Sequence, residues 1–322
     1  MGHAVQKRGR AEIVHRLDSL IARFERRVRR RLLTAINAIR SEITLSQLVT
    51  LLEGGRINEA IELTQRAIAV VVEEVEQGFL ISAQAMASYT AGRIGTNAPF
   101  DMTDERAIAI LRANRSRLVT EFTAQQRELL TDMLVRGRVE GQGIRETARL
   151  YRQSIGLTSH QERQVRSFRR SLELGERDAL RRALRDRRFD RTVERAISGD
   201  RPLTKAQIDR MENRYRERFI RMRAETIART ETLRAIHEGA QESLRQSIAS
   251  GLIEADAVVQ TWITAADARR RDWHTTMHRQ QRGFGELFVS GQGNTLRHPG
   301  DVRAAREEII NCRCSLATRI NR

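Results

Sequence analysis

Near the start of this chain, apolar residues recur at steps of three and four, and this spacing constrains the fold more than any other feature. The series is Ile13, Leu17, Leu20, Ile21, Phe24, Val28, Leu32, Ile36, Ile39 and Ile43. Steps of this kind place all members on one face of a helix. The three prolines stand at positions 99, 202 and 299, so long helices can run without interruption. We therefore expect a helix over 11–45 that buries this face.

Capping and breaking residues predict further helices. The expected helices cover about 57–91, 103–136, 144–153 and 205–250, with a helix-rich stretch over 159–199. Thr103 and the two acidic residues after it indicate an N-cap with an acidic first turn. Thr158 and Thr204 are each followed three residues later by Gln, which is the capping-box pattern. The N-terminal half and the middle of the chain should therefore be helical.

The pattern changes after Gly251. Apolar and polar residues alternate over 258–264, which predicts a strand, and a second strand is expected at 312–320. Between them we expect a helix at 266–279, glycine-rich loops and a helix at 302–308. The expected fold class is mainly α, with long amphipathic helices and a small C-terminal α+β domain. The expected regions are an N-terminal helical region (1–136), an Arg-rich helical region (137–250) and the C-terminal domain (251–322).

The positive charge is concentrated in the middle of the chain. The net charge is +17, and residues 145–223 hold 22 Arg and one Lys against 12 acids, a balance of +11. Guanidinium groups bind phosphate and carboxylate well, so this zone is suited to nucleic acid or to an acidic protein surface. A solvated helix face is the alternative. The candidate DNA-binding residues are Arg163, Arg166, Arg169, Arg170, Arg181, Arg182, Arg185, Arg187 and Arg188.

Two histidines and two cysteines in the C-terminal region form a candidate zinc site. His274 and His278 are four residues apart, so a helix would place both on one face. Cys312 and Cys314 are two apart, so a strand would point both sulfur atoms the same way. Four such ligands can hold zinc tetrahedrally. The alternative is a small core in which reduced thiols act as apolar groups and His274 is hydrogen-bonded by a neighbour.

Other ordered residues in this region suggest structural roles. Asp267, Arg271 and His274 would share a helix face at i, i+4 and i+7, as a salt-bridged cluster or, alternatively, as an acid–base site. Pro299-Gly300-Asp301 predicts a turn, with Asp301 capping the helix at 302–308. Trp262 is expected in the core. The Arg229-Thr230-Glu231 segment should dock its helix against the C-terminal domain.

Taken in order, these motifs resemble the phage head-morphogenesis family of MuF-type minor head proteins. The matching residues are Arg229, Thr230, Glu231, Trp262, Asp267, Arg271, His274, Phe288, Pro299, Gly300, Asp301, Asn311, Cys312 and Cys314. The match covers roughly residues 137–322. The chain departs from the family at His278-Arg279-Gln280, where the family usually has an acidic or amide residue, then Gly and Gln.

The resemblance implies a minor capsid protein of a tailed phage or related element. It would be assembled in the host cytoplasm and reside in the virion, at the portal or capsid interior. Its implied partners are the portal protein, the major capsid protein or both, with packaged DNA as a further contact. It implies neither catalysis nor a membrane. The alternatives are a metal-dependent or acid–base enzyme that uses His274, His278, Cys312 and Cys314, and a general nucleic-acid-binding protein of the host.

Overall fold

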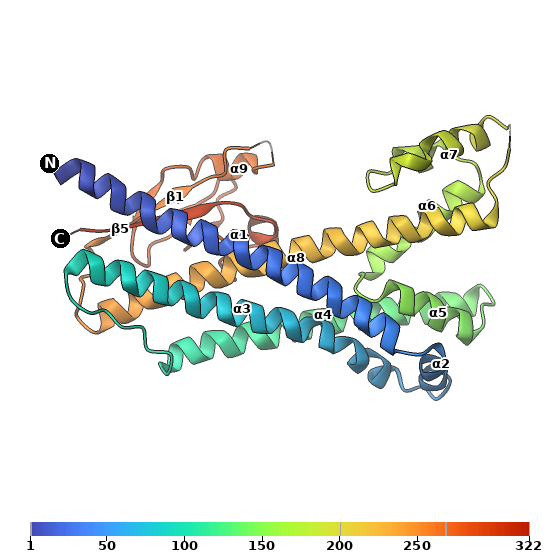
Figure 1. The fold of residues 1–322 in the computed structure, drawn as a ribbon, viewed down its shortest axis with the longest axis horizontal. Helices are drawn as coiled ribbons and strands as arrows, with labels where there is room; N and C mark the ends of the chain where they lie inside the picture. Colours follow the sequence, from blue (N-terminus) through green and yellow to red (C-terminus); the bar gives the residue numbers. More distant parts are fainter. Residues whose placement is uncertain (1, 200, 268, 322) are drawn as a thin grey trace. The chain divides into compact units, whose positions relative to one another are not determined.

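The computed structural model describes residues 2–199, 201–267 and 269–321, with side chains from residue 13 onward. The fold is mainly α, and its strands lie near the C-terminus (Figure 1), which confirms the expected fold class. The helices are α1 (Gly2–Glu42), α2 (Leu45–Glu53), α3 (Ile57–Ile94), α4 (Glu105–Val139), α5 (Ile144–Ser154), α6 (Ser159–Glu173), α7 (Asp190–Ile197) and α8 (Lys205–Ala249). Short 3-10 turns, η1 (Arg177–Arg181) and η2 (Arg187–Phe189), precede α7. In the described part of the chain, no helix is apolar over a length sufficient to cross a bilayer.

Side-chain caps mark the starts of α4, α6 and α8. Thr158 accepts a hydrogen bond from the backbone of Gln161 and its own backbone donates to the Gln161 side chain, as a capping box requires. Thr204 and Gln207 exchange the same two bonds before α8. At α4 the expected N-cap was wrong by one residue. Asp104, rather than Thr103, accepts from the first-turn amides of α4, because Thr103 is bonded to Asp101 instead.

A three-stranded antiparallel sheet has the order β2-β1-β5, formed by Gln281–Gly283, Val258–Ile263 and Ser315–Ile320. A second pair joins β3 (Phe288–Val289) and β4 (Thr295–Leu296). β5 is an edge strand, and Tyr89 and Arg93 of α3 donate to its Thr318 and Ile320 carbonyls. These bonds cover main-chain acceptors that an open edge would leave unpaired.

The helices of this region are shorter than expected. The predicted extent of the helix at 266–279 is wrong, because among the described residues of this range only those of α9 (Asp272–Thr275) are helical. The predicted helix at 302–308 is a single turn, α10 (Arg306–Ile309). Asp301 does not cap it. Its carboxylate instead accepts from the backbone amides of Arg297 and Arg303, and so closes the Pro299-Gly300 turn.

The chain divides into two compact units that are not consecutive ranges. Unit 1 contains residues 1–30, 71–115 and 225–322, and unit 2 contains residues 31–70 and 116–224. The long helices α1, α3, α4 and α8 each contribute segments to both. The ranges 1–136, 137–250 and 251–322 therefore describe the order of segments along the chain but are not the compact units.

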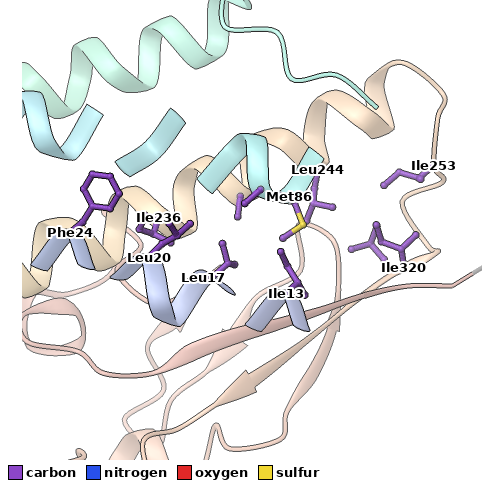
Figure 2. Close-up of a cluster of buried hydrophobic side chains, with 12 residues drawn as sticks. Ile13, Leu17, Leu20, Phe24, Met86, Ile236, Leu244, Ile253 and Ile320 are labelled. Atoms are coloured by element: carbon purple, nitrogen blue, oxygen red, sulfur yellow. The ribbon is translucent and has the colours of Figure 1, made fainter. Parts of the chain in front are cut away.

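Within unit 1, the first part of α1 packs its apolar face against the C-terminal domain. Ile13, Leu17, Leu20 and Phe24 are buried against α3, α8 and β5. Figure 2 shows them converging with Met86, Ile236, Leu244, Ile253 and Ile320. The same spacing continues through buried Val28, the last member in unit 1, to Leu32, Ile36, Ile39 and Ile43 of unit 2, which are also buried. The predicted buried face of this helix is thus confirmed.

Unit 2 has its own core, which includes an aromatic cluster. Phe168 of α6 stacks on Tyr215 of α8 at a centroid distance of 4.3 Å, and Phe219 meets Tyr215 edge-on at 5.0 Å. The turn after α5 is held by Gln126, which donates to the Leu157 carbonyl and accepts from the Gly156 amide. These contacts fix the helices that carry the arginine-rich surface.

Candidate metal centre

Three potential metal ligands, His274, Cys312 and Cys314, come together in the C-terminal domain. α9 carries His274, and the two cysteines lie just before β5. One nitrogen or sulfur atom from each lies within 4.8 Å of the others. Nδ1 of His274 is 3.4 Å from Sγ of Cys314 and 3.8 Å from Sγ of Cys312. All three side chains are buried, and both cysteines are free.

An apolar shell surrounds this group. The Trp262 ring meets the His274 ring edge-on at 6.0 Å between centroids and lies 5.3 Å from the Phe288 ring. Met277 and Leu316 are buried in the same cluster. Trp262 is fully buried, which confirms its predicted place in the core. Such a shell excludes water and strengthens electrostatic interactions inside it.

A buried carboxylate, Glu308 of α10, holds the histidine ring from its other side. Its Oε2 lies 2.6 Å from Nε2 of His274 and accepts from the Trp273 indole at 3.1 Å. Its Oε1 accepts from Ser290 at 2.9 Å and from Asn294 at 2.8 Å. Glu308 is fully buried, and four donors satisfy its charge. Because Nε2 is hydrogen-bonded to this carboxylate, Nδ1 is the nitrogen that faces the two sulfur atoms.

These contacts shift the pKa values of the group. Burial raises the pKa of Glu308, but hydrogen bonds from Asn294, Ser290 and His274 hold it below its usual value. Burial lowers the pKa of His274, but Cys314 and Glu308 together raise it. The neighbouring Cys312 thiol and the His274 ring lower the pKa of Cys314, while Cys314 and burial raise that of Cys312. Cys314 is therefore the thiol that ionises first, and the thiolate is the form that binds metal.

The geometry fits a metal ion of the zinc type. One imidazole nitrogen and two thiolates are ligands that zinc prefers. A carboxylate that binds the outer nitrogen of a ligating histidine is the usual support for such a ligand. His274, Cys312 and Cys314 could therefore hold a metal ion, with one tetrahedral position left for a non-protein ligand.

His278 does not join this group, so its prediction as a ligand is wrong. The helix that would have aligned it with His274 ends at Thr275. Nδ1 of His278 accepts a hydrogen bond from the backbone amide of Thr264, 3.2 Å away. The next residue, Arg279, has φ +70°, a left-handed conformation that favours glycine. The turn is thus kept at the position where the resembled family has glycine.

The expected cluster of Asp267, Arg271 and His274 does not form. Asp267 pairs with Arg313, and Arg271 donates to the Ile310 carbonyl. His274 is held by Glu308 as described. The three residues cannot share a helix face, because only the last lies in α9.

The Arg229–Glu231 segment of α8 contributes to docking in part. Thr230 accepts from the Asn311 backbone amide at 3.0 Å. Asn311 has φ +57°, which asparagine tolerates better than most residues. Glu231 binds Arg234, whose Nε donates to the Gly300 carbonyl. Arg229 instead pairs with Glu25 of α1.

Most of the nine candidate DNA-binding arginines are already paired with carboxylates. The pairs are Arg163–Asp132, Arg166–Glu140, Arg169–Asp209, Arg169–Glu212, Arg182–Asp178, Arg185–Asp190 and Arg188–Asp186. Arg170, Arg181 and Arg187 are exposed and have no ion pair with any described residue. The surface charge is therefore less available than the sequence count suggests.

Glu308 is the functional residue that the sequence analysis missed. It lies next to exposed Glu307, and both precede Ile309 in a four-residue turn. No periodicity distinguishes the two acids in so short an element. Comparisons of this chain with protein-family models, curated proteins and solved structures gave no match. Function must therefore be inferred from the residues and their geometry.

Proposed function

We propose that this chain is a minor head protein of a tailed phage or related element, located at the portal or capsid interior. One observation carries the proposal. The motif residues Thr230 and Asn311, 81 positions apart in the sequence, are joined by a hydrogen bond that docks the small C-terminal domain on α8, and the Asn311 side chain also donates to Thr226 of that helix. The motifs thus define one structural module docked on α8. A module of this kind is suited to assembly contacts with portal or major capsid protein.

The module is further proposed to be stabilised by one zinc ion bound to His274, Cys312 and Cys314. The chemistry of the donor set and the anchoring by Glu308 support zinc over harder cations, which prefer oxygen ligands. Bound zinc would supply a cross-link between α9 and the segment before β5. In so small a domain, such a link contributes directly to folding.

Elemental analysis of the purified chain tests the zinc assignment. We expect one zinc per chain, lost in Cys312→Ser/Cys314→Ser and retained in His278→Ala. The His278 variant is the matched control, because that imidazole lies outside the group. Zinc-free wild-type protein, or loss of zinc in His278→Ala, would contradict the assignment.

Contact with packaged DNA is proposed for the arginine-rich surface, through Arg170, Arg181 and Arg187. Neutralised phosphates release counterions, so binding should weaken steeply with salt. Replacing all three by Ala should reduce the slope of log K against log salt by about 2–3. Replacing the exposed Arg269, Arg270 and Arg306 should leave the slope unchanged. Equal slopes for the two triple variants would contradict the assignment of this surface.

Quantitative mass spectrometry of purified particles tests the virion proposal itself. We expect a few copies per particle, measured against the portal protein as an internal standard. A comparison of DNA-filled and emptied heads separates a fixed component from one that leaves with DNA. Absence of the chain from both kinds of particle would overturn the proposal.

The alternative is a metal-dependent or acid–base enzyme, now without His278. One observation favours it: His274 lies between a carboxylate and a thiol, as in sites that activate a nucleophile. Burial of His274, Cys312 and Cys314 opposes substrate access. Alkylation by iodoacetamide distinguishes a structural metal site from an enzyme active site. A structural site predicts slow modification of the zinc-loaded chain, whereas rapid modification of Cys314 in that form at neutral pH would favour the enzyme.

A further inference from the structure

A cavity of about 600 Å³ lies elsewhere in unit 1. Its walls come from the start of α4, the C-terminal half of α8, the strand β1 and two loops, around 284–285 and 297–303. The volume is in the range of small-molecule binding sites. The cavity shares no lining residue with the His274 group.

The acidic groups of this cavity are already engaged. Glu242 is bound by Arg245 at 2.7 Å and by Arg106 at 3.4 Å. Asn114 donates to Glu238 at 2.6 Å, and Asp301 accepts the two loop amides described above. The negative charges therefore have partners within the fold.

Two arginines of the cavity are not engaged. The guanidinium groups of Arg297 and Arg303 have no hydrogen bond or ion pair to the residues that the structure describes, and Nε of Arg297 is buried without a partner. The Asp301 carboxylate accepts from the backbone amides of both residues, so the Pro299-Gly300-Asp301 turn fixes the backbone positions from which the two arginine side chains extend. Gly300 permits this turn with φ +85°, where an added Cβ would lie 3.0 Å from Cα of Arg234. The turn thus presents two cations to one cavity.

A buried amide provides an independent indication of a ligand. Gln260 lies on β1 two residues from both Val258 and Trp262, so the three side chains share one face of the strand. Val258 and Trp262 are both buried in apolar clusters, so an apolar residue would be expected at position 260. Gln260 is 2 % exposed and lines the cavity, yet its Nε2 has no partner within the described structure. An unpaired buried amide is costly unless another group satisfies it.

We infer that this cavity binds a nucleotide-sized phosphate monoester. Two free guanidinium groups and an amide donor match the charge and the three terminal oxygens of such a phosphate. A carboxylate would supply one charge and two oxygens only. Phe284 also lines the cavity and is packed on the apolar cluster behind it, so its ring offers a stacking surface for a base. This inference does not depend on the virion proposal.

Isothermal titration calorimetry of the full chain with AMP, adenosine and inorganic phosphate tests the inference. AMP should bind, and adenosine should bind at least about tenfold more weakly because it lacks the phosphate. Arg303→Ala should weaken AMP binding by about tenfold, and Arg297→Ala/Arg303→Ala should weaken it further. Arg306→Ala is the matched control, since Arg306 is exposed close by but does not line the cavity. The affinity of this variant for AMP should stay within twofold of the wild-type value.

Gln260→Leu gives a second measurement. It should weaken AMP binding while raising the melting temperature of the ligand-free chain, since it removes an unpaired buried amide. A structural role for Gln260 would instead lower the melting temperature. No AMP binding at millimolar concentration, or equal affinity of wild type and the double variant, would overturn the inference. Inorganic phosphate binding as tightly as AMP would overturn the nucleotide assignment.

Discussion

The arginine-rich region at 145–223 and the C-terminal domain use polar residues in opposite ways. In the first, pairs such as Arg166–Glu140 are about 40 % exposed at both side chains. In the second, Glu308 is fully buried and receives four hydrogen bonds. Exposed pairs contribute little to stability, whereas a buried network holds one arrangement. The polar pairs of the first region thus contribute little to its structure, whereas the structure of the second depends on its buried network.

The largest expected effect is at Glu308. Glu308→Ala leaves the four donors without an acceptor and should lower the free energy of unfolding by about 3–5 kcal/mol. Glu307→Ala, one residue away and exposed, should change it by less than about 0.5 kcal/mol. Urea denaturation followed by tryptophan fluorescence reports directly on unfolding of the C-terminal domain, since Trp262 and Trp273, the two tryptophans of the chain, both lie in it. Equal effects of the two variants would contradict the role given to the network.

Arg216 tests whether burial, rather than region, sets the strength of an ion pair. Within the arginine-rich region it is 2 % exposed and binds Glu212 at 2.6 Å, with Glu162 at 3.7 Å. Arg216→Ala leaves buried Glu162 without its arginine and Glu212 with Arg169 alone, and should cost about 3 kcal/mol. Arg166→Ala removes an exposed pair and should cost about 0–1 kcal/mol. Chemical denaturation followed by circular dichroism measures the loss of unfolding free energy in both variants. Similar losses would contradict the idea that burial sets the strength of these ion pairs.

Acid should destabilise unit 1 through His237. This buried side chain of α8 lies 6.2 Å from the His298 ring, and burial lowers the pKa of His237 to about 3. Between pH 6.5 and 3 the unfolded chain binds a proton that the folded chain does not, so stability falls as the pH falls.

The slope due to His237 should be about 1.4 kcal/mol per pH unit within that window. His237→Leu should flatten the dependence, measured by urea denaturation at pH 5 and pH 7. His160→Gln is the control, because His160 is exposed and is the one histidine of the arginine-rich region. An unchanged slope in His237→Leu would show that other groups carry the acid sensitivity.

The smallest expected effect is at Arg279. Its φ of +70° is unfavourable for a side chain, so Arg279→Gly should raise the free energy of unfolding by about 0.5–1 kcal/mol. Gly293→Ala is the reciprocal test, since Gly293 has φ +80° and open space around it; it should lower stability by a similar amount. Thermal melting of both variants is sufficient. A destabilising Arg279→Gly would mean that the side chain contributes more than its backbone strain.

The sequence by itself determined what depends on neighbours within a few residues. The apolar face of α1, the capping boxes before α6 and α8, and the alternation of β1 all follow from such short-range spacing. The positions of His274, Cys312 and Cys314 could be predicted as a candidate group because each residue type has metal chemistry of its own. The role of Glu308 could not be predicted, since its four hydrogen-bond donors lie between 14 and 35 positions away in the sequence.

Tertiary structure decided the rest by competing with local preference. His278 does not lie in a helix as expected. The Thr264 amide donates to its ring, and the amide of the next residue, Arg279, donates to the Trp262 carbonyl. Asp301 was expected to cap a helix. Its carboxylate instead accepts from the backbone amides of Arg297 and Arg303 and so closes the loop that carries these two arginines. At His278 a hydrogen bond from Thr264, fourteen residues away, replaced the helical bonds, whereas at Asp301 two amides of its own loop replaced the expected helix cap. Burial makes every unpaired polar group costly, so the long-range partners determined the final geometry of the site.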